Sequence, residues 1–141
     1  MMNPVHTLLI IEDCAGDVLL TQQAMAELQI SVRITVARDG EQALIMLSDQ
    51  DFRPDLIILD LNIPRVTGLG FLQRYRQRDV PIVVFSSSQN TIEIQQALEL
   101  GAREYVEKPS NLEAFNAVLR GMIRKWVLRE GEATSNAASG G

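Results

Sequence analysis

Five short apolar runs, separated by longer segments with helical periodicity, constrain the fold of this 141-residue chain more than any other feature. The runs are TLLII at 7–11, VRITV at 32–36, LIIL at 56–59, PIVVF at 81–85 and EYV at 104–106. Several of them are unbroken and rich in β-branched residues, with no alternation of apolar and polar positions. Unbroken apolar strands are typical of parallel sheets, in which helices cover both faces.

A segment with helical features follows each apolar run. We expect these helices over the ranges 17–28, 39–48, 68–78, 91–102 and 110–128. Strand and helix therefore alternate five times along the chain. This order predicts an α/β fold with a doubly wound, five-stranded parallel sheet.

Local signals refine the expected helices. Gly101 is expected to end the fourth helix, because glycine is a common helix terminator. Ser110, with Glu113 three residues later, forms a capping-box pattern that predicts the start of the fifth helix. The first helix is expected to carry an approximate apolar stripe made of Val18, Leu19, Met25 and Leu28.

Length and composition fit one domain over residues 1–128, followed by a disordered polar tail or linker at 129–141. The net charge of −5 argues against a nucleic-acid partner, which usually requires a basic face. The N-terminal segment resembles neither a signal peptide nor a membrane span, so we expect a cytoplasmic protein without a membrane partner. Cys14 is the single cysteine and is expected to pack under the first helix.

Three carboxylates follow two of the expected strands. Glu12 and Asp13 come after the first strand, and Asp60 comes after the third. In doubly wound sheets, ligands bind beyond the carboxyl ends of the strands, where the strand order switches. If the first and third strands are neighbours, these like charges repel one another unless a cation joins them. Hard oxygen ligands suit Mg²⁺ or Mn²⁺, and a carboxylate neutralised by a metal can attack phosphorus.

Two further polar residues follow the fourth and fifth expected strands. Ser86 follows the fourth strand and offers a hydroxyl, and Lys108 follows the fifth and offers an ammonium. Together with the carboxylates they would complete a site for phosphoryl transfer. Simpler interpretations remain open: Asp60 could be a turn residue, and the Glu12–Asp13 pair could cap the first helix, with Asp17 as a rival cap.

Four motifs occur in order within residues 7–128: IIED, LIILDLNIP with TGLGFL, PIVVFSS and GAREYVEKP. Because of these motifs, the chain resembles the receiver domain of two-component response regulators. The resemblance implies the flavodoxin-like strand order 2-1-3-4-5, with helices on both faces. It implies that Asp60 is the phosphoacceptor. It also implies that Glu12, Asp13, Asp60 and the backbone carbonyl of Asn62 hold Mg²⁺ or Mn²⁺.

The same resemblance gives roles to residues around the expected phosphoryl group. Ser86 takes the place of the switch threonine or serine, Lys108 that of the lysine that pairs with the phosphate, and Tyr105 that of the aromatic side chain that follows activation. Asn62 and Ser88 occupy positions that tune the lifetime of the phosphoryl group. The peptide bond before Pro109 is expected to be cis, as it often is in the family. The FSSSQN loop also resembles that of single-domain regulators associated with phytochrome-type kinases.

The implied function is a phosphorylation switch that is not an enzyme, apart from taking the phosphoryl group from phosphohistidine and losing it slowly. The implied partners are a histidine kinase or phosphotransfer protein, and a downstream target or second copy bound by the face of helix four, strand five and helix five. Trp126 and Val127 could belong to a dimer surface.

Three other protein classes share parts of this pattern. A haloacid dehalogenase-type phosphatase requires an aspartate where this chain has Asn62. A flavin-binding flavodoxin would place its phosphate where Glu12 and Asp13 would repel it. A receiver-like scaffold that does not depend on phosphorylation remains the alternative.

Overall fold

The computed structural model describes residues 5–75 and 79–128, and the expected tail at 129–141 lies outside them. Strands and helices alternate along the described chain in the order β1 (His6–Ile11), α1 (Ala15–Glu27), β2 (Val32–Ala37), α2 (Gly40–Leu47), β3 (Leu56–Leu59), α3 (Gly68–Arg74), β4 (Ile82–Ser86), α4 (Thr91–Glu99), β5 (Glu104–Glu107) and α5 (Leu112–Trp126). All strand pairs are parallel, and the strand order is β2-β1-β3-β4-β5. The predicted fold class and strand order are confirmed.

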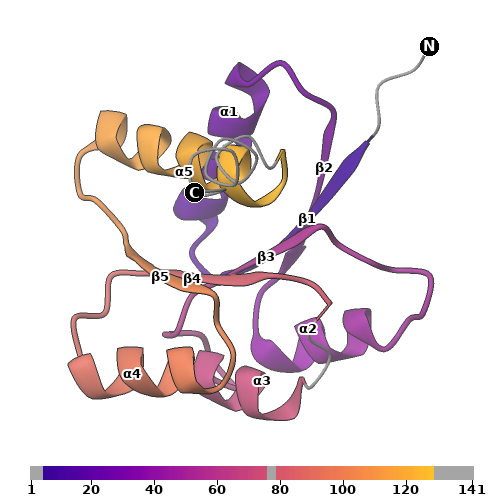
Figure 1. The fold of residues 1–141 in the computed structure, drawn as a ribbon, viewed down its shortest axis with the longest axis vertical. Helices are drawn as coiled ribbons and strands as arrows, with labels where there is room; N and C mark the ends of the chain where they lie inside the picture. Colours follow the sequence, from indigo (N-terminus) through magenta and orange to yellow (C-terminus); the bar gives the residue numbers. More distant parts are fainter. Residues whose placement is uncertain (1–4, 76–78, 129–141) are drawn as a thin grey trace, which may run out of the picture.

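The sheet forms the middle layer of three. Figure 1 shows α1 and α5 together on one side of the sheet, and α2, α3 and α4 on the other. Leu9 and Ile11 of β1 pack in the core cluster that includes Phe71 of α3, whereas Leu8 and Ile10 pack in the cluster that includes Phe115 of α5. Successive strand residues point to opposite faces. The central strands are therefore apolar at every position because each face is covered.

Side-chain caps fix the start of four helices. Asp39, Thr67, Asn90 and Asn111 each accept a hydrogen bond from a backbone N–H in the first turn of the helix that follows. These bonds satisfy amides that have no partner within the helix. The expected start of α5 at Ser110 is wrong by one position, because Asn111 is its cap and accepts from the N–H of Ala114 at 3.0 Å.

The fourth helix ends as its sequence predicts. Gly101 has φ 114°, which a residue with a side chain rarely adopts. Its N–H donates to the carbonyl of Leu98, and the N–H of Ala102 donates to the carbonyl of Ala97. This pair of bonds is the Schellman ending of a helix.

The inward face of α1 differs from the predicted stripe. Its buried residues are Thr21, Ala24 and Met25, whereas Leu19 is 54% exposed. Residues three and four apart share a helix face, so the stripe through Thr21, Ala24 and Met25 leaves Leu19 to one side. The placement of Cys14 was also wrong. Cys14 is exposed and precedes α1 as its N-cap residue, with no capping bond from its side chain.

None of the helices in the described ranges is long and apolar enough to cross a membrane.

Candidate functional site

An acidic cluster lies at the carboxyl edge of the sheet. Strands β1 and β3 are neighbours, with Ile11 paired to Leu59, so Glu12 and Asp60 leave the sheet side by side. The N–H of Asp60 donates to the carbonyl of Ile11 at 3.0 Å, which extends the strand pairing into the site. One carboxylate oxygen from each of Glu12, Asp13 and Asp60 lies within 4.8 Å of the others. The sequence prediction brought these three residues together correctly.

Close packing holds the loop after β3 in place. A Cβ atom on Gly68 would lie 2.6 Å from the Cα of Leu61 and 2.8 Å from the carbonyl oxygen of Asp60. No real side chain fits at these distances, so the start of α3 approaches the backbone of the site as only glycine allows. The N–H of Asn62 donates to Oδ1 of Asp60 at 3.1 Å. The loop therefore fixes the direction of the Asp60 carboxylate.

Lys108 reaches into the cluster from the end of β5. Its Nζ donates to Oε1 of Glu12, to Oδ2 of Asp17 at 2.8 Å and to Oδ2 of Asp60 at 3.1 Å. The side chains of Lys108, Glu12 and Asp60 are 9%, 6% and 9% exposed. A buried ammonium thus stands among carboxylates that would otherwise repel one another.

The two buried carboxylates differ in acidity. Burial raises the pKa of Glu12 to about 7. The hydrogen bond from Lys108 lowers this pKa, and the negative charge of Asp60 raises it further. Burial also acts to raise the pKa of Asp60, but the Asn62 N–H, the Lys108 charge and the Ser86 hydroxyl outweigh it and hold the pKa below its usual value. Asp60 is therefore ionised near neutral pH, where Glu12 is still partly protonated.

Burial acts in the opposite sense on the lysine. It disfavours the charged ammonium, but the hydrogen bonds to Asp17 and Glu12, with the charges of Glu12 and Asp60, hold the pKa of Lys108 above its ordinary value. The ammonium stays charged throughout the physiological range. A fixed positive charge next to a nucleophilic carboxylate is what phosphoryl transfer requires.

Ser86 is the last residue of β4 and contacts the Asp60 oxygen that Lys108 does not. The side chain is fully buried, and its Oγ donates to Oδ1 of Asp60 at 2.8 Å. The same oxygen accepts from the N–H of Ser88 at 3.3 Å. Ser86 is the first of three consecutive serines, and its hydroxyl contacts Asp60 as predicted.

Tyr105 of β5 lies beneath the loop that links β4 to α4. Its hydroxyl donates to the backbone carbonyls of Ser86, at 3.3 Å, and of Ser88. Burial raises the pKa of the Tyr105 hydroxyl, and the charge of Glu107 adds to the effect, so the phenol stays protonated as a donor. Ser88 also donates through its Oγ to Oε1 of Glu93 at 3.0 Å. Tyr105 and Ser88 are thus joined to the site through Ser86.

Two expectations need correction or addition. The peptide bond before Pro109 is trans, as are the others in ranges 5–75 and 79–128, so the expected cis bond is wrong. Asp17 was considered only as a helix cap, yet its carboxylate contacts Lys108. Asp17 lies in the first turn of α1, the helix that follows β1 at the carboxyl edge of the sheet.

One hollow in the described part of the chain adjoins the site. A hollow of about 450 Å³ lies between α1 and β2 and includes Glu12, Asp13, Val18 and Leu19 in its lining. Leu19, displaced from the predicted core stripe, forms part of its wall.

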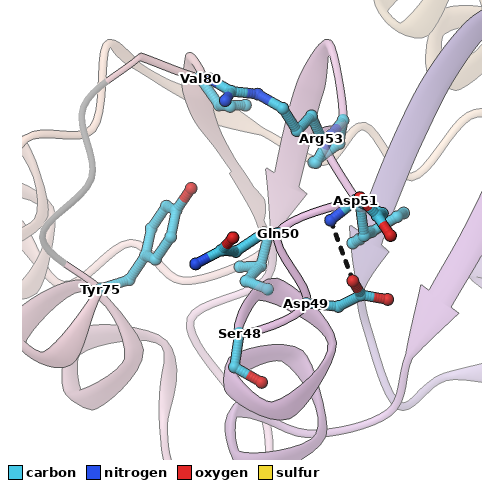
Figure 2. Close-up of a pocket in the computed structure, with 10 residues that line it drawn as sticks. Ser48, Asp49, Gln50, Asp51, Arg53, Tyr75 and Val80 are labelled. Carbon is cyan, nitrogen blue, oxygen red and sulfur yellow. Dashed lines mark hydrogen bonds between the residues drawn. The ribbon is translucent and has the colours of Figure 1, made fainter.

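A second hollow, of about 490 Å³, lies at the amino ends of β3 and β4, away from the acidic cluster. Figure 2 shows the turn before β3 that lines it, where Asp49 accepts from the N–H of Asp51, and the Tyr75 side chain on the opposite wall. No residue of the acidic cluster lines this second hollow.

The donor set of the cluster fits a divalent cation. Three carboxylates offer hard oxygen atoms at mutual distances that one ion can bridge, and the buried Glu12 and Asp60 gain from neutralisation. Sulfur and imidazole ligands are not part of the cluster, which disfavours softer metals.

Comparisons with curated proteins identify relatives across most of the chain. Transcriptional regulatory protein AfsQ1 of Streptomyces coelicolor is 33% identical over 135 residues, which cover 95% of this chain and 57% of AfsQ1. Response regulator Rcp1 of Synechocystis sp. is 30% identical over 134 residues, which cover 89% of this chain and 91% of Rcp1. The chain therefore spans a little over half the length of AfsQ1 but most of Rcp1.

Solved structures agree with these relatives. The structure of the phosphorylated cyanobacterial phytochrome response regulator RcpA matches with a TM-score of 0.82 and 28% identity, over 88% of this chain and 95% of RcpA. The Mn²⁺-bound form of Rcp1 matches with a TM-score of 0.79 and 29% identity, over 86% and 94% of the two chains. A family model described as the response regulator receiver domain matches residues 8–120. The chain belongs to the response regulator receiver domain family, the signalling domains of two-component systems.

Proposed function

We propose that this chain is a phosphorylation switch whose phosphoacceptor is Asp60. The observation that carries the proposal is the set of contacts around one carboxylate. Oδ1 of Asp60 accepts from Ser86 and from the Asn62 N–H, and Oδ2 accepts from Lys108. A carboxylate that is buried, ionised and surrounded by fixed donors is prepared to act as a nucleophile.

The proposed step is transfer from phosphohistidine on a histidine kinase or phosphotransfer protein. An oxygen of the Asp60 carboxylate attacks phosphorus, and the phosphorus–nitrogen bond breaks. The histidine nitrogen keeps the electron pair and takes a proton, which leaves an acyl phosphate on Asp60. Lys108, already directed at Oδ2, pairs with the negative charge of the transferred group.

The ion we propose for the acidic cluster is Mg²⁺, with Mn²⁺ as a substitute, held by Glu12, Asp13, Asp60 and the backbone carbonyl of Asn62. When bound, it would supply positive charge that lets an anionic donor approach the carboxylates. The support is the number and hardness of the oxygen donors. The Mn²⁺-bound form of Rcp1 also shows that a relative takes such an ion.

The proposed switch runs from Ser86 to Tyr105. The Ser86 hydroxyl would leave Asp60 for a phosphoryl oxygen, and the N–H of Ser88 would then lose its acceptor. Tyr105, which holds the carbonyls of this loop, would follow. The affected face, made of α4, β5 and α5, would bind a downstream protein or a second copy. Asn62 and Ser88 flank the acyl phosphate and are proposed to set its lifetime.

The location we propose is the cytoplasm, where histidine kinases expose their phosphohistidine. The domain would span 1–128. The identity of the kinase, of the signal and of the output partner is open to experiment.

Intact-protein mass spectrometry after incubation with acetyl phosphate and Mg²⁺ tests the proposal. We expect one labile phosphoryl group per chain, abolished by EDTA and by Asp60→Asn. Asp51→Asn is the matched control, because Asp51 is an exposed aspartate at the opposite edge of the sheet. Equal labelling of wild type and Asp60→Asn would refute the assignment. Absence of labelling with both acetyl phosphate and a phosphorylated histidine kinase would favour the phosphorylation-independent scaffold. Size-exclusion chromatography of the labelled sample would detect a second copy.

A further inference from the structure

Asp17 has a contact that the proposed phosphorylation step does not use. Its Oδ2 accepts from Nζ of Lys108 at 2.8 Å, closer than the 3.1 Å from the same nitrogen to Asp60. Asp17 comes from the first turn of α1 and is not a member of the carboxylate group that could hold a cation. The ammonium of Lys108 is thus shared between the nucleophile and a carboxylate outside the metal cluster.

The start of α1 explains why Asp17 is available for this contact. An acidic residue three positions after the N-cap often turns back to the N-cap amide, as in a capping box. Here the N–H of the N-cap residue Cys14 donates instead to Oε2 of Glu12, at 3.2 Å. Because Glu12 takes the capping bond, the Asp17 side chain is directed at Lys108. The Asp17 carbonyl still accepts from the Thr21 hydroxyl at 2.9 Å, which keeps the residue within regular helix.

Burial makes the contact stronger than an ordinary surface pair. The Asp17 side chain is 29% exposed and the Lys108 side chain is 9% exposed. Hydrogen bonds between ionised partners are about twice as strong as neutral ones, and limited exposure reduces screening by salt. Lys108 has few donors, and each one given to Asp17 is withheld from Asp60 or from a group attached to it.

We infer that Asp17 is a positioning residue that holds Lys108 on the α1 side of the site in the resting protein and restrains phosphorylation of Asp60. This inference rests on the proposed function. Lys108 must move from Asp17 towards the incoming phosphoryl group, so Asp17 competes with that group for the ammonium. Removing the Asp17 charge frees Lys108 for Asp60. The change speeds phosphorylation at saturating Mg²⁺. It also weakens Mg²⁺ binding, because the freed Lys108 ammonium competes more effectively with the cation for the Asp60 carboxylate.

The test compares wild type, Asp17→Asn, Asp17→Glu and Glu27→Gln. Glu27 lies on the same helix and pairs with Arg120 at 2.9 Å, so its neutralisation removes one ion-paired carboxylate far from the site. We expect Asp17→Asn to be phosphorylated roughly threefold to tenfold faster by acetyl phosphate and to bind Mg²⁺ more weakly by a similar factor. Glu27→Gln should match wild type, and Asp17→Glu should restore much of the wild-type behaviour.

A spectroscopic signal separates positioning from general stability. The sequence has two lysines, Lys108 and Lys125, so ¹⁵N-lysine labelling gives two Nζ resonances, one of which is an internal reference. In the metal-free protein, Asp17→Asn should shift the Lys108 resonance and speed its hydrogen exchange, whereas Glu27→Gln should not.

An unchanged Lys108 resonance in Asp17→Asn would overturn the inference. So would phosphorylation and Mg²⁺ affinity that both stay within about twofold of wild type despite a shifted resonance. Wild type that takes no phosphoryl group would refute the proposed function instead, and the Lys108 resonance and Mg²⁺ affinity would still decide the role of Asp17.

Discussion

Substitution of Lys108 by methionine should expose the electrostatic cost of the site. Methionine keeps most of the side-chain volume but removes the one ammonium that contacts Glu12, Asp17 and Asp60. Removing one partner of a buried ion pair costs about 3–5 kcal/mol, because the other charge stays buried and unpaired. At about pH 8 in EDTA we expect a loss of this size, which lowers the melting temperature by roughly 10–20 °C in a domain of this length.

The loss of stability caused by Lys108→Met should increase with pH. The pKa of Glu12 is raised from 4.5 to about 7, so its contribution to stability is complete below 4.5 and is lost as the pH rises through 7. Lys108 opposes this rise, so the substitution moves the Glu12 pKa higher still. At about pH 6, Glu12 carries a proton in both proteins and needs no cation. The destabilisation should therefore be smaller at pH 6 than at pH 8, by about 1 kcal/mol or more.

Urea or thermal unfolding at both pH values, with and without Mg²⁺, measures these effects. Saturating Mg²⁺ should restore part of the lost stability, since a ligand at 100 times its Kd contributes about 2.7 kcal/mol. Lys125→Met is the control, because Lys125 is 53% exposed and its pair with Glu104 should contribute less than about 1 kcal/mol. Equal stability of Lys108→Met and wild type at pH 8 in EDTA would refute the reasoning.

Two further contacts, one at Gly68 beside the site and one between Glu104 and Trp126, can be tested by substitution. Gly68→Ala should destabilise the fold by about 1–3 kcal/mol and slow phosphorylation, because the new methyl group would displace the backbone of Asp60; Gly121→Ala, where nothing lies within 4 Å, should stabilise it slightly, and similar effects of the two in a urea titration would contradict the packing. Glu104→Gln should alter the emission of Trp126, the single tryptophan, because Glu104 accepts from its Nε1 at 2.9 Å. An unchanged emission spectrum would contradict that contact.

The fold was predictable because its strongest signal is local. Unbroken apolar runs such as 56–59 require cover on both faces, and the helices that provide it lie between the strands. Errors arose where tertiary contacts decide between neighbouring positions. Leu19 fits an apolar stripe as well as its neighbours do, but the packing of α1 against the sheet selects Thr21, Ala24 and Met25.

The site was predictable where residues follow strands. Glu12, Asp60, Ser86 and Lys108 end four strands of one parallel sheet, so the topology alone brings them together. Asp17 was missed because a helix residue reaches the site only through the direction of its side chain. That direction depends on which carboxylate caps α1, and the sequence pattern left this choice open.

The measurement that tests the central claim most directly locates the phosphoryl group. The chain is phosphorylated with acetyl phosphate and Mg²⁺ and reduced with borohydride, which converts an aspartyl phosphate to homoserine, and the peptides are sequenced by mass spectrometry. Homoserine at position 60, absent without Mg²⁺ and in Asp60→Asn, is the result that the account requires. Homoserine at Asp13 or Asp17 with an unmodified Asp60 would contradict it.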